Sequence, residues 1–207
     1  MLQVHGLACQ RGSRRLFSGL EFSLAPGHWL QVEGHNGAGK TSLLRILAGL
    51  SPAEEGHITW QGRPVREVRD AFNAQLLYLG HAPAIKDDLS ALENLQTSAA
   101  LAGQPVDELR ALKALRQWGL KGREDLSSRV LSQGQKRRVA LARLLCASAP
   151  LWILDEPFVA LDVAAVAQLC QIIDTHLSGG GMVLFTSHQA VQLQAPGGPL
   201  TLGGGEA

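Results

Sequence analysis

The octapeptide GHNGAGKT, residues 34–41, constrains the fold more than any other part of the chain. An apolar run of strand length, WLQV, precedes it, and leucines at helical spacing follow it between residues 41 and 50. Its glycines let successive backbone N–H groups turn inward, and the N-terminus of the following helix adds partial positive charge. A strand, a glycine-rich loop and a helix in this order predict a phosphate-binding unit in an α/β fold. The alternative is an ordinary glycine-rich turn that happens to contain a lysine.

This loop supplies most of the candidate nucleotide ligands. The ammonium of Lys40 can reach the β- and γ-phosphates of ATP, and the hydroxyl of Thr41 can ligate Mg²⁺. We therefore expect ATP and Mg²⁺ as cofactors. The residues that we expect to surround the phosphates are Gly34, His35, Asn36, Gly37, Ala38, Gly39, Lys40, Thr41 and Ser42.

A second motif, WILDEP at residues 152–157, places two carboxylates at the end of a continuous apolar run. Asp155 would lie at the carboxyl end of a buried strand, where it can hold Mg²⁺ through water. Glu156 follows it, and a carboxylate there can polarise the attacking water as a general base. The simpler interpretation, that Asp-Glu-Pro only ends a strand, loses weight once a phosphate loop lies upstream.

A third motif, LSQGQKRR, begins at Leu131. Ser132 and Gln135 form an S-x-x-Q capping box, which predicts that a helix begins here and presents N–H groups to an anion. Gly134 allows close backbone approach. The alternative is a well-capped surface helix whose basic residues are solvated; these are Lys136, Arg137 and Arg138.

The rest of the chain predicts a helical insertion into an α/β core. Residues 2–8, 20–25, 29–34 and 57–62 have strand character, and LLYLG, WILD and MVLFTS read as strands buried on both faces. Between residues 89 and 129 the periodicity is helical throughout. Residues Val163, Val166, Cys170, Ile173 and Leu177 follow helical spacing, which predicts a helix with these side chains in the core.

Composition narrows the possible functions. The 207 residues carry 19 basic and 18 acidic side chains, so no basic field favours nucleic acid. The three cysteines are far apart in the sequence, which fits a reducing compartment rather than a disulfide framework. No apolar run approaches the roughly 18 residues that a membrane-spanning helix needs.

The three motifs together resemble the ATP-binding cassette (ABC) ATPases, whose signature LSGGQ is matched here except at Gln133. The resemblance covers nearly the whole chain, and the motifs follow one another in the same order as in the family. It implies an α/β P-loop NTPase fold with an antiparallel β subdomain and an inserted helical subdomain. Residues 1–207 would form one ATPase domain, with the core at 1–87 and 151–207 and the helical subdomain, including the signature helix, at 88–150.

The resemblance also assigns roles near the ends of two strands. VALD, residues 159–162, would be the D-loop, in which Asp162 can also be a helix N-cap. His188 in TSHQ would be the switch histidine beside the γ-phosphate, holding the attacking water and Glu156. In this family the phosphate loop of one subunit faces the signature helix of another, with Ser132, Gly134 and Gln135 on the nucleotide. One chain has one of each, so a second copy is an expected partner in an ATP-dependent dimer.

Two positions depart from the common family pattern. No aromatic residue lies near Arg11, where the family often stacks one on adenine, so either Arg11 stacks there or the base is held loosely. His81 replaces the usual Q-loop glutamine, the residue that senses the γ-phosphate and contacts the membrane partner. An imidazole can donate and accept hydrogen bonds as an amide does, and can also ligate a metal. The alternative is a hinge residue that touches nothing.

The stretch LYLGHAPAIKDDLSALENL, with the histidine, resembles one branch, the ATP-binding subunits of the cytochrome c maturation (Ccm) haem exporter. The branch implies an energy-coupling ATPase, peripheral on the cytoplasmic face of the bacterial inner membrane. Its partners would be an integral membrane transporter subunit and, indirectly, haem and a haem chaperone, with no nucleic acid. Two alternatives remain at this point: an ABC exporter ATPase for another cargo, or a soluble cassette ATPase acting on nucleic acid or ribosomes.

Overall fold

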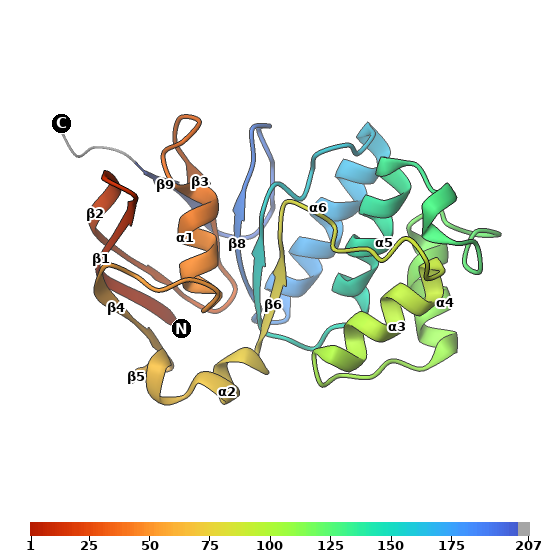
Figure 1. Cartoon of the computed structure of the whole chain (residues 1–207), viewed down its shortest axis with the longest axis horizontal. Helices are drawn as coiled ribbons and strands as arrows, with labels where there is room; N and C mark the ends of the chain where they lie inside the picture. The colour runs from red at the N-terminus through yellow and green to blue at the C-terminus, as the bar shows by residue number, and fades with distance from the viewer. Residues whose placement is uncertain (203–207) are drawn as a thin grey trace. The chain divides into compact units, whose positions relative to one another are not determined.

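The computed structural model describes residues 1–202, which divide into two compact units (Figure 1). The core unit comprises Met1–Tyr78, Ala149–Glu156 and the chain from Ile173 onward. The helical unit comprises Leu79–Ser148 and Pro157–Ile172. No helix in the described residues is long and apolar enough to cross a membrane.

The core unit contains a four-stranded antiparallel sheet in the order β2-β1-β4-β5. Gly56 shows why this sheet needs glycine at one point: it has φ +83°, and a Cβ there would collide with the backbone carbonyls of His5 and Gly6 on the neighbouring strand. The strands are β1 (Leu2–Arg11), β2 (Arg14–Leu24), β4 (Glu55–Trp60) and β5 (Arg63–Pro64). A short 3₁₀ turn (Val65–Glu67) and helix α2 (Arg69–Asn73) follow.

The second sheet of the core unit has five strands in the order β6-β7-β8-β3-β9. Strand β3 runs parallel to both β8 and β9, and β7 runs parallel to β8. Every residue of β7 and β8 is buried, which confirms that these apolar runs form the centre of a covered sheet. The strands are β3 (Trp29–Glu33), β6 (Leu76–Leu79), β7 (Leu151–Leu154), β8 (Met182–Thr186) and β9 (Gly197–Thr201).

Helix α1 (Lys40–Leu47) follows β3 directly and buries its apolar face in the core. The buried side chains of this face are Leu43, Leu44, Ile46 and Leu47, which join Ile153 of β7 and Leu184 of β8 in one apolar cluster. The helix ends three residues before the predicted Leu50, because Gly49 adopts φ +69° and Leu50 donates its N–H back to the carbonyl of Arg45.

The helical unit is built around α5 (Gln133–Cys146), against which both α3 (Ala91–Leu101) and α4 (Glu108–Gln117) pack. Ser90 and Glu93 form a full capping box at the start of α3, and Asp107 caps α4. A 3₁₀ turn (Ser128–Val130) leads into α5. The prediction of helices without strands between residues 89 and 129 is confirmed.

Helix α6 (Val163–Ser178) is found where the spacing predicted it, but its buried face was only partly identified. Val163 is 88% exposed, because the first turn of the helix carries its buried position at Ala165 instead. Ile173 and Leu177 are buried as predicted, and Cys170 is half-buried. A single ATPase domain with boundaries at 87/88 and 150/151 stays a prediction; the compact units divide at 78/79 and 148/149, and the helical unit also takes in Pro157–Ile172.

Candidate functional site

The glycine-rich loop between β3 and α1 has the backbone of an anion cradle. Gly37 and Gly39 have φ +83° and +99°, and a Cβ at Gly39 would lie 3.0 Å from the Cβ of Leu16. Gly39 is the N-cap of α1 and offers no side-chain cap, and the first helical turn holds no acidic residue. The first N–H groups of a helix have no partner within it, so this turn is available to a phosphate.

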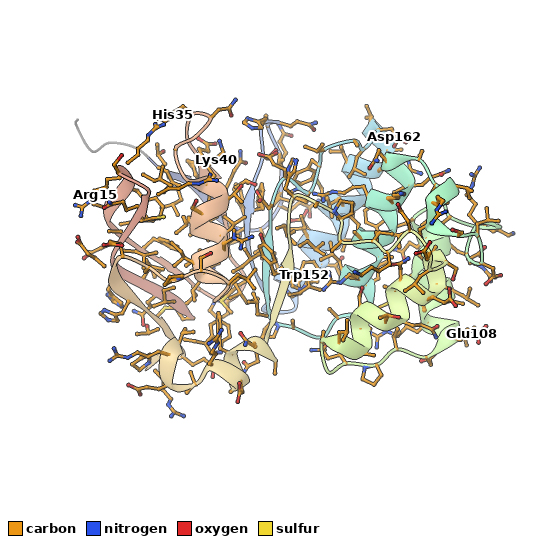
Figure 2. All side chains as sticks on the ribbon, viewed as in Figure 1. Arg15, His35, Lys40, Glu108, Trp152 and Asp162 are labelled. Atoms are coloured by element: carbon orange, nitrogen blue, oxygen red, sulfur yellow. The ribbon has the colours of Figure 1, made fainter. Side chains whose placement is uncertain are left out.

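Lys40 closes the loop in this structure. Its ammonium donates to the carbonyl of Gly34 at 2.7 Å and lies 3.4 Å from the carbonyl of His35. Figure 2 shows Lys40 at the start of α1 with His35 on the preceding loop. The ammonium is thus already placed over the cradle, where phosphate oxygens can replace the carbonyls as acceptors. Of the remaining loop residues, Asn36, Gly37 and Thr41 are exposed, Ser42 is half-buried and Ala38 is buried.

Two carboxylates meet at the carboxyl end of β7, where they were predicted. Asp155 is 2% exposed and Glu156 is 8% exposed. The Thr186 hydroxyl, at the end of the neighbouring strand β8, donates to Asp155 Oδ1 at 2.8 Å and accepts from the Glu156 N–H at 2.8 Å. Thr186 was not identified from the sequence. The only sequence signal was its place at the end of an apolar run, because the pairing with the strand that ends at Leu154 appears only in the fold.

Glu156 and His188 lie together. The Nε2 atom of His188 is 3.4 Å from Oε1 of Glu156, and the histidine is largely exposed while the glutamate is not. Glu156 has φ +50°, an unusual conformation for a residue with a side chain, and its N–H bond to Thr186 holds it there. The pair expected from the family resemblance is therefore brought together by the fold of the core unit.

The charge of this site also affects the pKa of Tyr78, which lies on β6 next to β7. Burial raises the pKa of the Tyr78 hydroxyl, and the negative charge of Asp155 raises it further. The sequence alone gave no reason to select this residue.

A cavity of about 580 Å³ lies beside the start of α1. It is lined by Arg11 from β1, Thr41 and Ser42 from α1, and Glu54 before β4, among others. None of its lining residues is aromatic, which agrees with the absence of an aromatic near Arg11 in the sequence.

In the helical unit, the predicted signature forms the N-terminus of α5. Ser132 Oγ accepts from the N–H of Gln135 at 3.2 Å, and Gln135 Oε1 accepts from the N–H of Ser132 at 2.9 Å. This is the reciprocal capping box that the sequence predicted. Gly134 faces the backbone of the predicted D-loop, since a Cβ there would lie 3.2 Å from the carbonyl oxygen of Ala160.

The D-loop is tied to the same helix through its last residue. Arg138 of α5 forms an ion pair with Oδ2 of Asp162 at 2.5 Å, while Oδ1 of Asp162 accepts from the N–H of Ala165 at 2.8 Å. Asp162 therefore has the helix-capping role expected for it, at the start of α6. His81, just after β6, is exposed, and it belongs to the helical unit with the signature.

Comparison with known proteins places these features in a family. The family model described as ABC transporter matches residues 17–159, which is more than half of the chain. The chain belongs to the ABC transporter family, and it is an ATP-binding subunit with ATPase activity. The fold expected from the resemblance is confirmed.

Curated relatives narrow the placement within the family. A cytochrome c biogenesis ATP-binding export protein CcmA from Dechloromonas aromatica is 57% identical over 94% of this chain and 96% of that protein. The protein of the same name from Escherichia coli K12 is 49% identical over 93% of this chain and 91% of that protein. The predicted branch of the family is thereby confirmed.

Solved structures support the same fold. A putative ABC transporter ATP-binding protein from Pyrococcus furiosus superposes with a TM-score of 0.83 at 24% identity, over 97% of this chain and 96% of that one. A dimeric ATP-binding cassette bound to ADP and Pi superposes with a TM-score of 0.80 at 21% identity, over 91% of this chain and 88% of that one.

Proposed function

We propose that this chain is the ATP-hydrolysing, energy-coupling subunit of a transporter complex for c-type cytochrome biogenesis, of the haem-exporter type. The observation that carries the proposal is a nucleotide site in a chain that is 57% identical to an export protein named for cytochrome c biogenesis. The site joins Lys40 over a phosphate cradle to the pair Glu156 and His188 beside the buried Asp155.

The residues present fit a bound Mg²⁺. The hydroxyl of Thr41 and the carboxylate of Asp155 are hard oxygen donors, the ligands that Mg²⁺ prefers, and the hydroxyl of Thr186 fixes one oxygen of Asp155. Mg²⁺ would neutralise negative charge on the phosphates. Within the protein, Thr186 holds the carboxylate in place before any ion arrives.

For hydrolysis, Glu156 would accept a proton from the attacking water. His188, 3.4 Å from the carboxylate, would orient that water and the glutamate side chain together. Lys40 would stabilise the charge on the β- and γ-phosphates, and the N–H groups of the loop residues 34–42 would hold the phosphates in line. His81 would report the state of the γ-phosphate to the membrane subunit.

A second copy of the chain would complete each nucleotide site. The phosphate loop belongs to the core unit and the signature residues Ser132, Gly134 and Gln135 belong to the helical unit. The capped N-terminus of α5 is a second surface of N–H groups suited to the γ-phosphate. We infer that ATP joins the phosphate loop of one copy to the signature of the other, and that hydrolysis parts them.

We propose further that the chain attaches to the cytoplasmic face of the bacterial inner membrane through an integral membrane subunit. This subunit would receive the motion of the ATPase dimer, and haem and a haem chaperone would be handled by the assembled system without binding this chain. The support comes from the curated relatives, which are named export proteins.

The test is purification of the tagged chain from the membranes of its own cell, with identification of the proteins that accompany it. The proposal expects a membrane transporter subunit, and expects the chain to leave the membrane fraction when that subunit is deleted. Recovery with ribosomes, or with a transporter for an unrelated cargo, would contradict it.

A further inference from the structure

The corner that follows β6 has an unusual backbone. β6 ends at Leu79, His81 is exposed, and Ala84 adopts φ +53°, the left-handed region that residues with a Cβ seldom occupy. A conformation of this kind persists only where surrounding groups hold it. Hydrogen bonds at the two ends of the segment 80–86 hold this corner.

Arg137 holds the first end. It lies in the second turn of α5 with 5% of its surface exposed, and one terminal nitrogen of its guanidinium donates to the carbonyls of Gly80 at 3.3 Å and His81 at 3.2 Å. A buried guanidinium has only donors and needs acceptors, and two of the acceptors that it has are the corner's own carbonyls.

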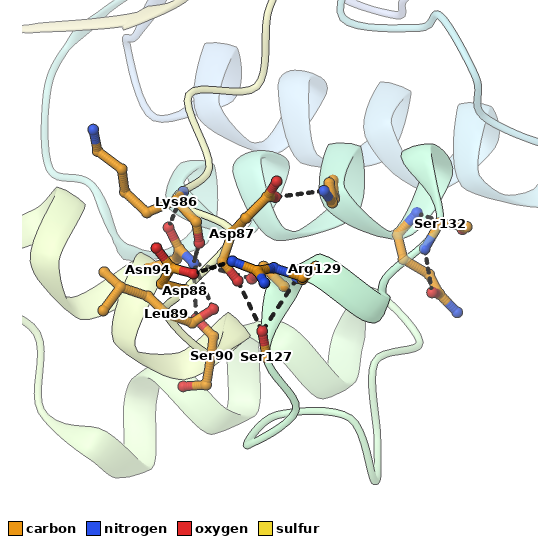
Figure 3. Close-up of polar contacts among 12 residues, drawn as sticks. Lys86, Asp87, Asp88, Leu89, Ser90, Asn94, Ser127, Arg129 and Ser132 are labelled. Carbon is orange, nitrogen blue, oxygen red and sulfur yellow. Dashed lines mark hydrogen bonds and ion pairs between the residues drawn. The ribbon is translucent and has the colours of Figure 1, made fainter.

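Asn94 of α3 holds the second end (Figure 3). Its Oδ1 accepts from the N–H of Lys86 at 2.8 Å, and its Nδ2 donates to the carbonyl of Lys86 at 2.9 Å and to the hydroxyl of Ser128 at 3.0 Å. One buried amide thus fixes both backbone groups of Lys86. The next residue, Asp87, forms an ion pair with Lys136 of α5 at 2.5 Å.

Both ends of the corner are consequently tied to the element that carries the signature. Arg137 and Lys136 stand in the turn of α5 that follows the capping box, and Ser128 belongs to the 3₁₀ turn just before Leu131. All these residues belong to the helical unit, so the ties act within one compact body.

We propose that Arg137 is a positioning residue for His81: by holding the carbonyls of Gly80 and His81 it makes the corner and the signature helix move as one piece. This inference rests on the proposed role of His81 in coupling and deepens it. A γ-phosphate engaged by Ser132 and Gln135 then sets the orientation of His81 through Arg137. The signature residues and His81 need not touch each other for this.

The test is a double-substitution cycle on ATP turnover, measured on the complex purified with its membrane proteins and on the full chain alone. Arg137→Met keeps the length of the side chain and removes the donors, and Arg137→Lys keeps the charge. Arg143→Met is the matched control, because Arg143 is a half-buried arginine on the same helix, and among the described residues it forms no hydrogen bond or ion pair with the corner. Thermal unfolding of each variant shows which of them are folded.

If Arg137 acts through His81, Arg137→Met and His81→Ala each lower turnover of the complex by about threefold to tenfold. The double variant is then no slower than the slower single variant, because the same link is lost only once. Arg137→Lys retains more turnover than Arg137→Met, and Arg143→Met stays within about twofold of the unsubstituted chain.

Losses that multiply in the double variant, or an equal loss in Arg143→Met, would overturn the proposal and leave Arg137 a residue of the fold alone. If Arg137→Met does not fold, Arg137→Leu, which also removes the donors, takes its place in the cycle with the same two outcomes. ATP turnover does not depend on which cargo is moved, so a wrong assignment to cytochrome c biogenesis would leave this result unaffected. Losses that multiply would disprove the role of Arg137 and would leave the proposed ATPase site unaffected.

Discussion

Glu156 combines two properties that a catalytic base needs. It is 8% exposed, so its carboxylate is shielded from bulk water, and its backbone is fixed by the bond from its N–H to Thr186. His188 approaches the carboxylate to 3.4 Å from the open side. The position of Glu156 is therefore set by the bond from its own backbone N–H to the side-chain hydroxyl of Thr186 on the neighbouring strand.

Glu156→Gln is expected to keep ATP binding and to lower ATP turnover by roughly 10²–10⁴-fold, because the amide cannot accept the proton of the attacking water. With hydrolysis blocked, ATP should hold two copies together, which size-exclusion chromatography measures. Lys40→Ala is the contrasting variant and should weaken ATP binding itself. Normal turnover by a monomeric Glu156→Gln chain would contradict both the base and the dimer.

Thr186 offers a second test at this scale, one that the sequence did not supply. Thr186→Val removes a buried hydroxyl with little change of shape and leaves Asp155 Oδ1 and the Glu156 N–H without this partner. We expect the free energy of unfolding to fall by about 1–3 kcal/mol and ATP turnover to fall with it. Thr186→Ser, which keeps the hydroxyl, should retain most of both; urea unfolding and an ATPase assay measure them. Equal losses in the two variants would show that the hydroxyl is not the cause.

The sequence best predicts the boundaries of those elements that are marked by a pattern within a short stretch of residues. The capping box of α5 is a relation between Ser132 and Gln135, and the buried strands β7 and β8 are continuous apolar runs. The contacts of Thr186 and Arg137 are different, because each joins residues 30 or more positions apart that only the folded sheet or helix pair brings together. Val163 was misassigned because periodicity cannot tell the first, solvent-facing turn of a helix from its core turns.

A half-buried imidazole near the C-terminal end of α6 packs on β7. His176 stacks on Trp152, with ring centroids 3.7 Å apart and planes 7° apart, and its Nε2 lies 3.2 Å from the carbonyl of Pro150. Gly181 makes room for it, since a Cβ there would collide with the imidazole. Burial lowers the pKa of His176, and the neighbouring carbonyl only partly opposes this effect.

The consequence is a stability that depends on pH. The folded pKa of His176 lies below that of the unfolded chain, about 6.5, so the unfolded state takes up a proton first as the pH falls. The contribution of His176 to the free energy of unfolding should therefore be at its full value above pH 6.5. It should decrease as the pH is lowered from 6.5 toward the folded pKa. Urea unfolding at pH 7.5 and 5.5 measures this decrease.

The substitution that isolates the effect is His176→Phe, which keeps a ring on Trp152 and cannot titrate. Its stability at pH 7.5 should be lower by about 1 kcal/mol for the lost hydrogen bond, but its decrease toward pH 5.5 should be smaller than in the unsubstituted chain. The control is His28→Gln on the exposed surface, which should leave the decrease unchanged. An equal decrease in His176→Phe would assign the pH dependence to other groups.

At the scale of the whole molecule, the proposed function requires two copies and a membrane subunit. One chain carries one phosphate loop and one signature, in two separate compact units. Both could be predicted from the sequence because each is a run of consecutive residues. The sequence could not predict the cavity beside Thr41, because that cavity is assembled from β1, α1 and the residues before β4.

The central claim is that ATP use by this chain drives the assembly of c-type cytochromes. The direct measurement is the yield of c-type and b-type haem proteins in a bacterium whose own copy of the gene has been deleted and replaced by the Lys40→Ala variant. Because Lys40 lies over the phosphate cradle, the variant should bring c-type cytochromes down to the level of the deletion strain while b-type haem proteins persist. Normal c-type cytochromes in cells that depend on the Lys40→Ala chain would contradict the claim.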